Sequence, residues 1–125
     1  MRVLIVDDSS VMRKIVARSL QQAGLNIAQI FEAANGAEAL VVVRLEKVDL
    51  ILCDINMPVM DGLELVKQLS GVENAHKVPV VMITTEGSEA HVVRALSAGA
   101  RGYIRKPFTS EQVKEQIIPI LAGNQ

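Results

Sequence analysis

Short apolar runs that each end at a charged residue constrain the fold of this chain more than any other feature. Uninterrupted runs of this length predict strands buried on both faces, as in a parallel sheet covered by helices. Four charged residues follow a predicted strand within two positions: Asp7, Asp8, Asp54 and Lys106. The carboxyl ends of parallel strands share one edge of an open sheet, so we expect these side chains to converge there.

The order of predicted elements defines the fold class. We predict strands at about residues 2–6, 27–32, 49–53, 80–83 and 101–104. Apolar residues at helical spacing predict helices at about residues 10–23, 37–45, 63–69, 88–97 and 110–121. Pro119 is expected to kink or shorten the last helix. Five strands alternating with five helices indicate an α/β fold, a doubly wound five-stranded parallel sheet.

Composition excludes several classes of function. The 125 residues, 50% of them hydrophobic, suffice for one core, so we expect residues 1–125 to form a single domain with no output domain. A net charge of −1 argues against nucleic acid and anionic membranes as partners, and two Phe and one Tyr cannot build a base-stacking platform. No apolar run approaches a membrane span, and the single Cys53 suits a reducing compartment. We expect a soluble cytoplasmic protein.

The adjacent acids predict a metal site. Three carboxylates at one sheet edge would resist ionisation unless a cation joined them. A hard divalent ion such as Mg²⁺, with oxygen ligands, would relieve the repulsion, so Asp7, Asp8 and Asp54 are candidate ligands. The backbone carbonyl of Asn56 is a further candidate. Acidic capping of the following helix is the alternative for Asp7 and Asp8, but two acids exceed what a cap needs.

Phosphoryl chemistry is the function that these residues favour. Asp54 could act as a carboxylate nucleophile toward phosphorus, with catalysis supplied by charge neutralisation and in-line positioning. Thr84 could donate to a phosphoryl oxygen, although a strand-end threonine is often only a cap. Lys106, held between a strand and Pro107, could pair with the same group, although most lysines are simply solvated. Tyr103 is either a strand aromatic covering the sheet edge or a rotamer switch.

Taken together, these segments resemble the receiver domain of two-component response regulators. The resemblance covers nearly the whole chain and is greatest to single-domain chemotaxis members. Four fragments carry it: Val6-Asp7-Asp8, the segment from Asp54 to Gly62, Met82-Ile83-Thr84 and Lys106-Pro107-Phe108. It implies a flavodoxin-like sheet with strand order 2-1-3-4-5.

The resemblance also implies roles for the site residues. Asp54 would accept a phosphoryl group from a phosphohistidine on a sensor histidine kinase, with Mg²⁺ as the cofactor. Asp8 would contact the metal directly, and Asp7 through water. Thr84 and Lys106 would bind the phosphoryl oxygens.

An output surface is implied as well. Phosphorylation would draw Thr84 inward and let Tyr103 rotate into the vacated space. The face formed by residues 88–97, 101–104 and 110–121 would then bind an unidentified downstream protein, with chemotaxis as the suggested pathway. We expect a monomer.

Positions that set the phosphorylated lifetime can also be assigned by resemblance. Asn56 and Glu86 match positions that tune acyl-phosphate hydrolysis, and the Lys106-Pro107 bond would be cis. Thr85 departs from the family pattern, because a smaller residue is often found there. The fourth predicted helix is not strongly basic, which argues against a flagellar motor component as the target.

Three other functions stay open. A flavodoxin-like FMN module would share the fold, but acids stand where a phosphate cradle belongs, and aromatic residues for stacking are scarce. An aspartate-nucleophile phosphatase would carry its nucleophile after the first strand and would need a substrate cap. A degenerate receiver would serve only for docking. We predict a signalling domain rather than an enzyme, with phosphotransfer and autodephosphorylation as its intrinsic chemistry and no organic cofactor.

Overall fold

A computed structural model describes residues 1–57, 59–73, 75, 77–84, 89–106 and 108–123. Within these ranges one parallel sheet has the strand order β2-β1-β3-β4-β5, which confirms the order implied by the resemblance. The strands are β1 (Arg2–Val6), β2 (Gln29–Ala33), β3 (Leu50–Asp54), β4 (Val80–Thr84) and β5 (Gly102–Arg105).

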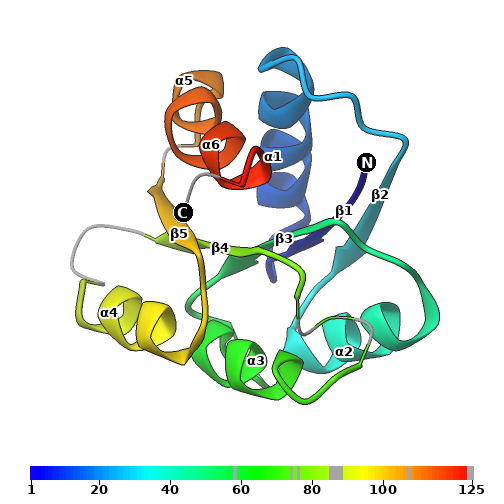
Figure 1. Ribbon diagram of the computed structural model, residues 1–125, viewed down its shortest axis with the longest axis vertical. Helices are drawn as coiled ribbons and strands as arrows, with labels where there is room; N and C mark the ends of the chain where they lie inside the picture. The colour runs from blue at the N-terminus through cyan, green and yellow to red at the C-terminus, as the bar shows by residue number, and fades with distance from the viewer. Residues whose placement is uncertain (58, 74, 76, 85–88, 107, 124–125) are drawn as a thin grey trace.

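Helices cover both faces of the sheet (Figure 1). One layer contains α2 (Gly36–Leu45), α3 (Gly62–Leu69) and α4 (Glu89–Ala98). The other contains α1 (Ser10–Gln22) and the C-terminal helical segment. The predicted doubly wound, flavodoxin-like architecture is therefore confirmed.

The core consists of two apolar clusters, one on each face of the sheet. Alternate residues of a strand point to opposite faces, so Val3 and Ile5 of β1 join the cluster with α1, whereas Leu4 and Val6 join the other. Every residue of β3 and β4 is buried. Burying one aliphatic side chain contributes about 1.5–3 kcal/mol. This burial holds the central strands in register and so fixes where their carboxyl ends lie.

Polar caps begin the helices directly after the strands or the loops that follow them. The Ser9 side chain accepts a hydrogen bond from the N–H of Met12, which makes Ser9 the cap of α1. Asp61 accepts from the N–H of Glu64 at the start of α3. Ser9 and Asp61 therefore mark where the connections after β1 and β3 become helical, at the same edge of the sheet as the predicted site.

Four strands, β2 to β5, end one residue later than predicted. Asp54, Thr84 and Arg105 are the last residues of β3, β4 and β5, because the parallel ladder continues through them. Asp54 pairs with Ile83, and Thr84 pairs with Arg105. These polar residues are thus held by the sheet itself. The second strand, predicted from residue 27, begins only at Gln29.

The last predicted helix is not continuous. It divides into α5 (Ser110–Gln112), a π-helix η1 (Val113–Ile117) and α6 (Ile118–Leu121). Pro119 lacks an N–H and its ring would crowd the carbonyl four residues earlier, so a wider turn before it relieves the clash. The helix predicted at residues 110–121 with a distortion caused by Pro119 is confirmed, and the distortion takes the form of the π-helix η1.

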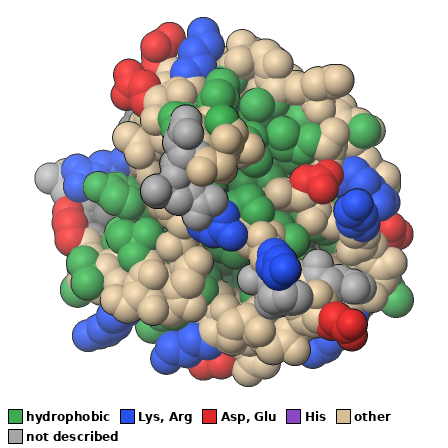
Figure 2. Space-filling view, viewed as in Figure 1, with side chains coloured by type: hydrophobic (Ala, Val, Ile, Leu, Met, Phe, Trp, Pro, Cys, Tyr) green, Lys and Arg blue, Asp and Glu red, His purple; other side chains and the backbone are tan. Residues whose placement is uncertain are grey.

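Charge is dispersed over the visible surface. In Figure 2, acidic and basic side chains are interspersed around the rim of the face shown. Across the described ranges, none of the helices combines the length and apolarity that a bilayer crossing requires.

Gly62 provides a test of the packing between α3 and β3. A methyl group at this position would lie 2.5 Å from the carbonyl oxygen of Asp54 and 2.9 Å from the Cα of Ile55. Gly62→Ala should therefore lower the free energy of unfolding by about 1–3 kcal/mol, measured by urea denaturation. Gly71→Ala is the matched control, because the nearest atom there is 3.6 Å away. Equal stability of the two variants would contradict this close packing.

Candidate functional site

The predicted acidic residues converge at the carboxyl edge of the sheet. Asp7 and Asp8 follow β1, and Asp54 ends β3, the strand beside it. One ligand oxygen from each of the three lies within 4.8 Å of the others. Asp7 and Asp54 are buried, whereas Asp8 is exposed. The arrangement presents three oxygen donors with one open side.

Lys106 reaches this cluster from the far strand. Its backbone N–H donates to the carbonyl of Thr84 at 2.7 Å, which extends the sheet ladder past β5. From there its Nζ lies 3.5 Å from Oδ2 of Asp54 and 3.7 Å from Oδ2 of Asp7. Since β5 and β3 are separated by β4, the long lysine side chain spans the edge of the sheet. Four residues predicted from strand ends therefore share one site.

Asp7 provides the observation that tests whether a cation fits. Its side chain is only 1% exposed. Oδ1 accepts the N–H of Ser9 at 2.9 Å, whereas buried Oδ2 has no hydrogen-bond partner among the described residues. Buried carboxylate oxygens without such a partner are rare in folded proteins. The three side chains of the cluster offer only oxygen ligands, which Mg²⁺ and Ca²⁺ prefer. The residues present therefore fit a hard divalent cation.

Burial dominates the electrostatics of the carboxylates. Desolvation raises the pKa of Asp7, and Asp8 raises it further, although the Ser9 N–H and the Lys106 ammonium oppose the shift. Desolvation likewise raises the pKa of Asp54, and the charge of Asp7 adds to this, while Lys106 opposes it. One ammonium does not offset the cost of ionising both carboxylates. The cluster favours an additional positive charge.

The nearby thiol is chemically quiet. Cys53 is buried beside Asp54, and burial raises the pKa of its thiol well above the usual value. It stays protonated and packs as a core residue.

Asn56 lies on the loop that follows Asp54. Its backbone N–H donates to Oδ1 of Asp54 at 3.3 Å, and its side chain is exposed. This contact holds one oxygen of Asp54, while the other faces Lys106. The predicted ligand and hydrolysis-tuning roles of Asn56 stay predictions.

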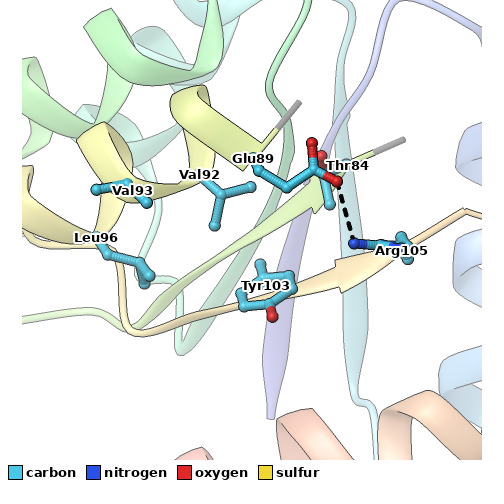
Figure 3. Close-up of a pocket in the computed structure, with 7 residues that line it drawn as sticks. All are labelled: Thr84, Glu89, Val92, Val93, Leu96, Tyr103 and Arg105. Atoms are coloured by element: carbon cyan, nitrogen blue, oxygen red, sulfur yellow. Dashed lines mark hydrogen bonds and ion pairs between the residues drawn. The ribbon is translucent and has the colours of Figure 1, made fainter. Parts of the chain in front are cut away.

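The two predicted switch residues line one groove between α4 and β5 (Figure 3). The groove has a volume of about 260 Å³. Thr84 is buried at its inner end, and Tyr103 is 43% exposed. Arg105 and Glu89 form an ion pair of 3.3 Å across part of the groove. Thr84 thus connects the acidic edge to an apolar surface groove.

Some predicted positions cannot be located. Thr85, Glu86 and Pro107 lie outside the described residues. The hydrolysis-tuning role of Glu86, the effect of a bulky Thr85 and the cis bond before Pro107 therefore stay predictions.

Two charged residues beside the site were not anticipated. Arg13, which the helical pattern places on the outer side of α1, is only 16% exposed and donates from Nη1 to the carbonyl oxygen of Asp7 at 2.6 Å. Its Nε donates to Oε1 of Glu32 at 2.7 Å. The available signal was the position of Glu32, one residue before the end of the second strand at the same sheet edge.

The raised pKa values give a testable effect on stability. A carboxyl whose pKa is higher in the folded state contributes stability that is full below the unfolded pKa and is lost as pH rises through the folded pKa. Asp7→Asn removes that loss while an amide oxygen can still accept the Ser9 N–H. In buffer without divalent ions the variant should have a higher Tm than the parent at pH 7, with the gain shrinking below pH 4.

Asp49→Asn serves as the control in the same thermal melts. Asp49 is exposed, and its Oδ2 accepts the N–H of Arg2, a bond that an amide oxygen can also make. Its Tm should stay close to that of the parent at both pH values. An Asp7→Asn protein that melts at or below the parent at pH 7 would show that the buried charge is not destabilising.

Comparison with known proteins agrees with this geometry. Residues 3–118 match the response regulator receiver domain. A chemotaxis protein CheY homolog of Campylobacter jejuni is 42% identical over 122 residues, covering 97% of this chain and 92% of the relative. Chemotaxis protein CheY1 of Helicobacter pylori is 41% identical over 130 residues, covering 99% of each chain.

Solved structures support the same assignment. A response regulator of Chloroflexus aurantiacus superposes with a TM-score of 0.86 at 30% identity, over 97% of both chains. The chemotaxis response regulator CheY4 of Vibrio cholerae gives a TM-score of 0.79 at 38% identity, over 91% of this chain and 92% of that one. The chain therefore belongs to the response regulator receiver domain family of two-component systems and is similar over nearly its whole length to CheY-type chemotaxis proteins.

Proposed function

We propose that residues 1–125 form a single phosphorylation-controlled switch in which Asp54 accepts a phosphoryl group from a phosphohistidine of a sensor histidine kinase. The observation that carries the proposal is the position of Lys106, whose Nζ lies 3.5 Å from Asp54 and 3.7 Å from Asp7. An ammonium beside a partly buried carboxylate, with further acids within 4.8 Å, suits transfer of a highly charged group. Family membership supports the same chemistry.

The transfer itself requires little covalent work from the protein. A carboxylate oxygen of Asp54 attacks phosphorus, the P–N bond to the histidine breaks, and the imidazole leaves with its electron pair and takes up a proton. Lys106 pairs with the charge on the phosphoryl oxygens, and the Thr84 hydroxyl donates to one of them. Positioning and charge neutralisation account for the rate, since carboxylates are weak nucleophiles. Attack of water on the acyl phosphate reverses the modification.

Mg²⁺ is the proposed cofactor. Asp8, Asp7, Asp54 and the carbonyl of Asn56 would hold it, with water completing the shell. When bound, the ion supplies positive charge that offsets the carboxylates and the phosphoryl oxygens. Oδ2 of Asp7, which has no hydrogen-bond partner among the described residues, supports this choice, as do the raised pKa values of Asp7 and Asp54.

The output would pass through the groove between α4 and β5. Thr84 lines this groove together with Tyr103. A phosphoryl group on Asp54 would draw the Thr84 hydroxyl toward the acidic edge, and the tyrosine ring, now partly exposed, would move into the vacated space. The altered face of α4, β5 and α5 would bind a downstream protein, with chemotaxis suggested by the named relatives.

Further features bear on the competing functions. A docking-only receiver has no need of a buried acidic cluster with an ammonium, which makes that alternative less favourable. The receiver family match favours a switch over an FMN module or a phosphatase. A reduced, buried Cys53 suits the proposed cytoplasmic location. We propose that the chain acts as a monomer.

Covalent labelling tests the acceptor. Incubation with acetyl phosphate and Mg²⁺ should add about 80 Da, the mass of one phosphoryl unit replacing a proton, measured by intact-mass spectrometry. Asp54→Asn should abolish the adduct, because an amide is not a nucleophile for this transfer. The control is Asp61→Asn, which keeps a cap for α3 and should label normally. Labelling of the Asp54→Asn protein would refute the assignment.

Metal titration tests the ligands. Asp8 is the exposed member of the cluster, so Asp8→Ala leaves the packed core intact while removing a proposed direct ligand. We expect Mg²⁺ affinity, measured by calorimetric titration, to fall at least about tenfold. An unchanged dissociation constant would mean that the ion binds elsewhere.

A further inference from the structure

We infer that Arg13, paired with Glu32, is a positioning residue that holds the Asp7–Asp8 peptide in the orientation needed for Mg²⁺ binding. The inference rests on the proposed function. Arg13 would contact neither the phosphoryl group nor the metal. Its ion pair with Glu32, which joins α1 to β2, would help to orient the acidic residues.

The contact is with the backbone of the acidic turn. Nη1 of Arg13 donates to the carbonyl oxygen of Asp7 at 2.6 Å, a short hydrogen bond. A peptide group is planar, so fixing this carbonyl fixes the plane that joins the Cα atoms of Asp7 and Asp8. That plane, together with the flanking backbone angles and χ1, sets the direction in which each carboxylate leaves the backbone. Arg13 therefore acts on both acids through one bond.

Further hydrogen bonds complete the hold on the turn. The Asp7 N–H donates to the carbonyl of Ala33 in β2 at 3.0 Å. Oδ1 of Asp7 accepts the Ser9 N–H. The backbone of Asp7 is thus held on its amide side by the sheet and on its carbonyl side by Arg13. Removing the guanidinium would free only the carbonyl side.

Glu32 orients the guanidinium. Its Oε1 accepts from Nε of Arg13 at 2.7 Å, while Nη1 is directed to Asp7. The planar fork of arginine can serve both acceptors at fixed geometry, which a lysine ammonium on a flexible stem does not reproduce. Glu32 is half exposed, so an ion pair here adds little to global stability. The role of the ion pair is to orient the Arg13 side chain toward the Asp7 carbonyl.

Charge alone predicts the opposite effect of losing Arg13. A guanidinium close to the cluster repels a divalent cation, so its removal would tighten Mg²⁺ binding if repulsion were its main influence. If Arg13 positions the turn, its removal weakens binding. The sign of the change in affinity therefore separates the two roles.

The experiment titrates Mg²⁺ into the full chain by calorimetry at fixed ionic strength. Arg13→Met should weaken binding about tenfold, as loss of a group that orients metal ligands typically does. Arg13→Lys keeps the charge but loses the fork, so it should also weaken binding. Glu32→Gln keeps an acceptor and should have a smaller effect. Lys14→Met, which removes a neighbouring exposed cation of α1, is the matched control and should bind within twofold of the parent.

These titrations distinguish a failure of the Arg13 inference from a failure of the proposed function. If the parent binds Mg²⁺ and Asp8→Ala does not, but Arg13→Met binds as tightly as the parent or more tightly, only this inference is overturned. If the parent fails to bind, the proposed function and the inference fall together. Thermal melts identify a purely structural role, which would lower Tm without changing the dissociation constant. Should Arg13→Met fold poorly, Arg13→Lys and Glu32→Gln decide the question.

Discussion

The ammonium of Lys106 between two buried carboxylates is the interaction on which the rest of the site depends. Asp7 and Asp54 are held where water cannot solvate them well, and burial raises the pKa of both. The arrangement persists because each acid ends or follows a strand whose apolar side chains are fully buried. The hydrophobic core thus enforces an electrostatically unfavourable cluster. A cluster of this kind favours an additional cation.

Much of the fold could be predicted because it rests on local patterns. The limits of β1 were predicted correctly, and Ser9 caps α1, in line with the general preference for serine at helix starts. The predicted strand ends were less accurate, because in the sequence an aspartate or threonine at the end of a strand cannot be distinguished from the first residue of a loop. The C-terminal helix shows a different limit. Pro119 indicates that a regular helix is impossible there, but whether the chain kinks, stops or widens into a π-turn depends on packing against the sheet.

The site was predictable where a residue lies at the end of a strand, and not where a long side chain reaches across elements. To predict that Asp54 and Lys106 lie close together, it was enough to know that parallel strands end at one edge of a sheet. Arg13 could not be placed in this way, because its partner Glu32 lies on the edge strand beside β1. Spacing along α1 shows that Arg13 is off the apolar stripe. It does not show that the side chain turns back toward Asp7.

The two loops that carry the acids both combine backbone and side-chain hydrogen bonds, but they differ in one contact. In the turn after β1, a side chain from another element, Arg13, holds the Asp7 carbonyl. In the loop after β3, the backbone itself packs closely: Gly62 lies against the Asp54 carbonyl, and its N–H donates to Ile55. Within it Val59 has a φ of 69° and is 84% exposed, a conformation that costs a β-branched residue about 1–3 kcal/mol. If Arg13 positions the turn after β1 as inferred, the shape of that turn depends on one arginine side chain. The loop after β3 is shaped instead through its own backbone, at Gly62 and Val59.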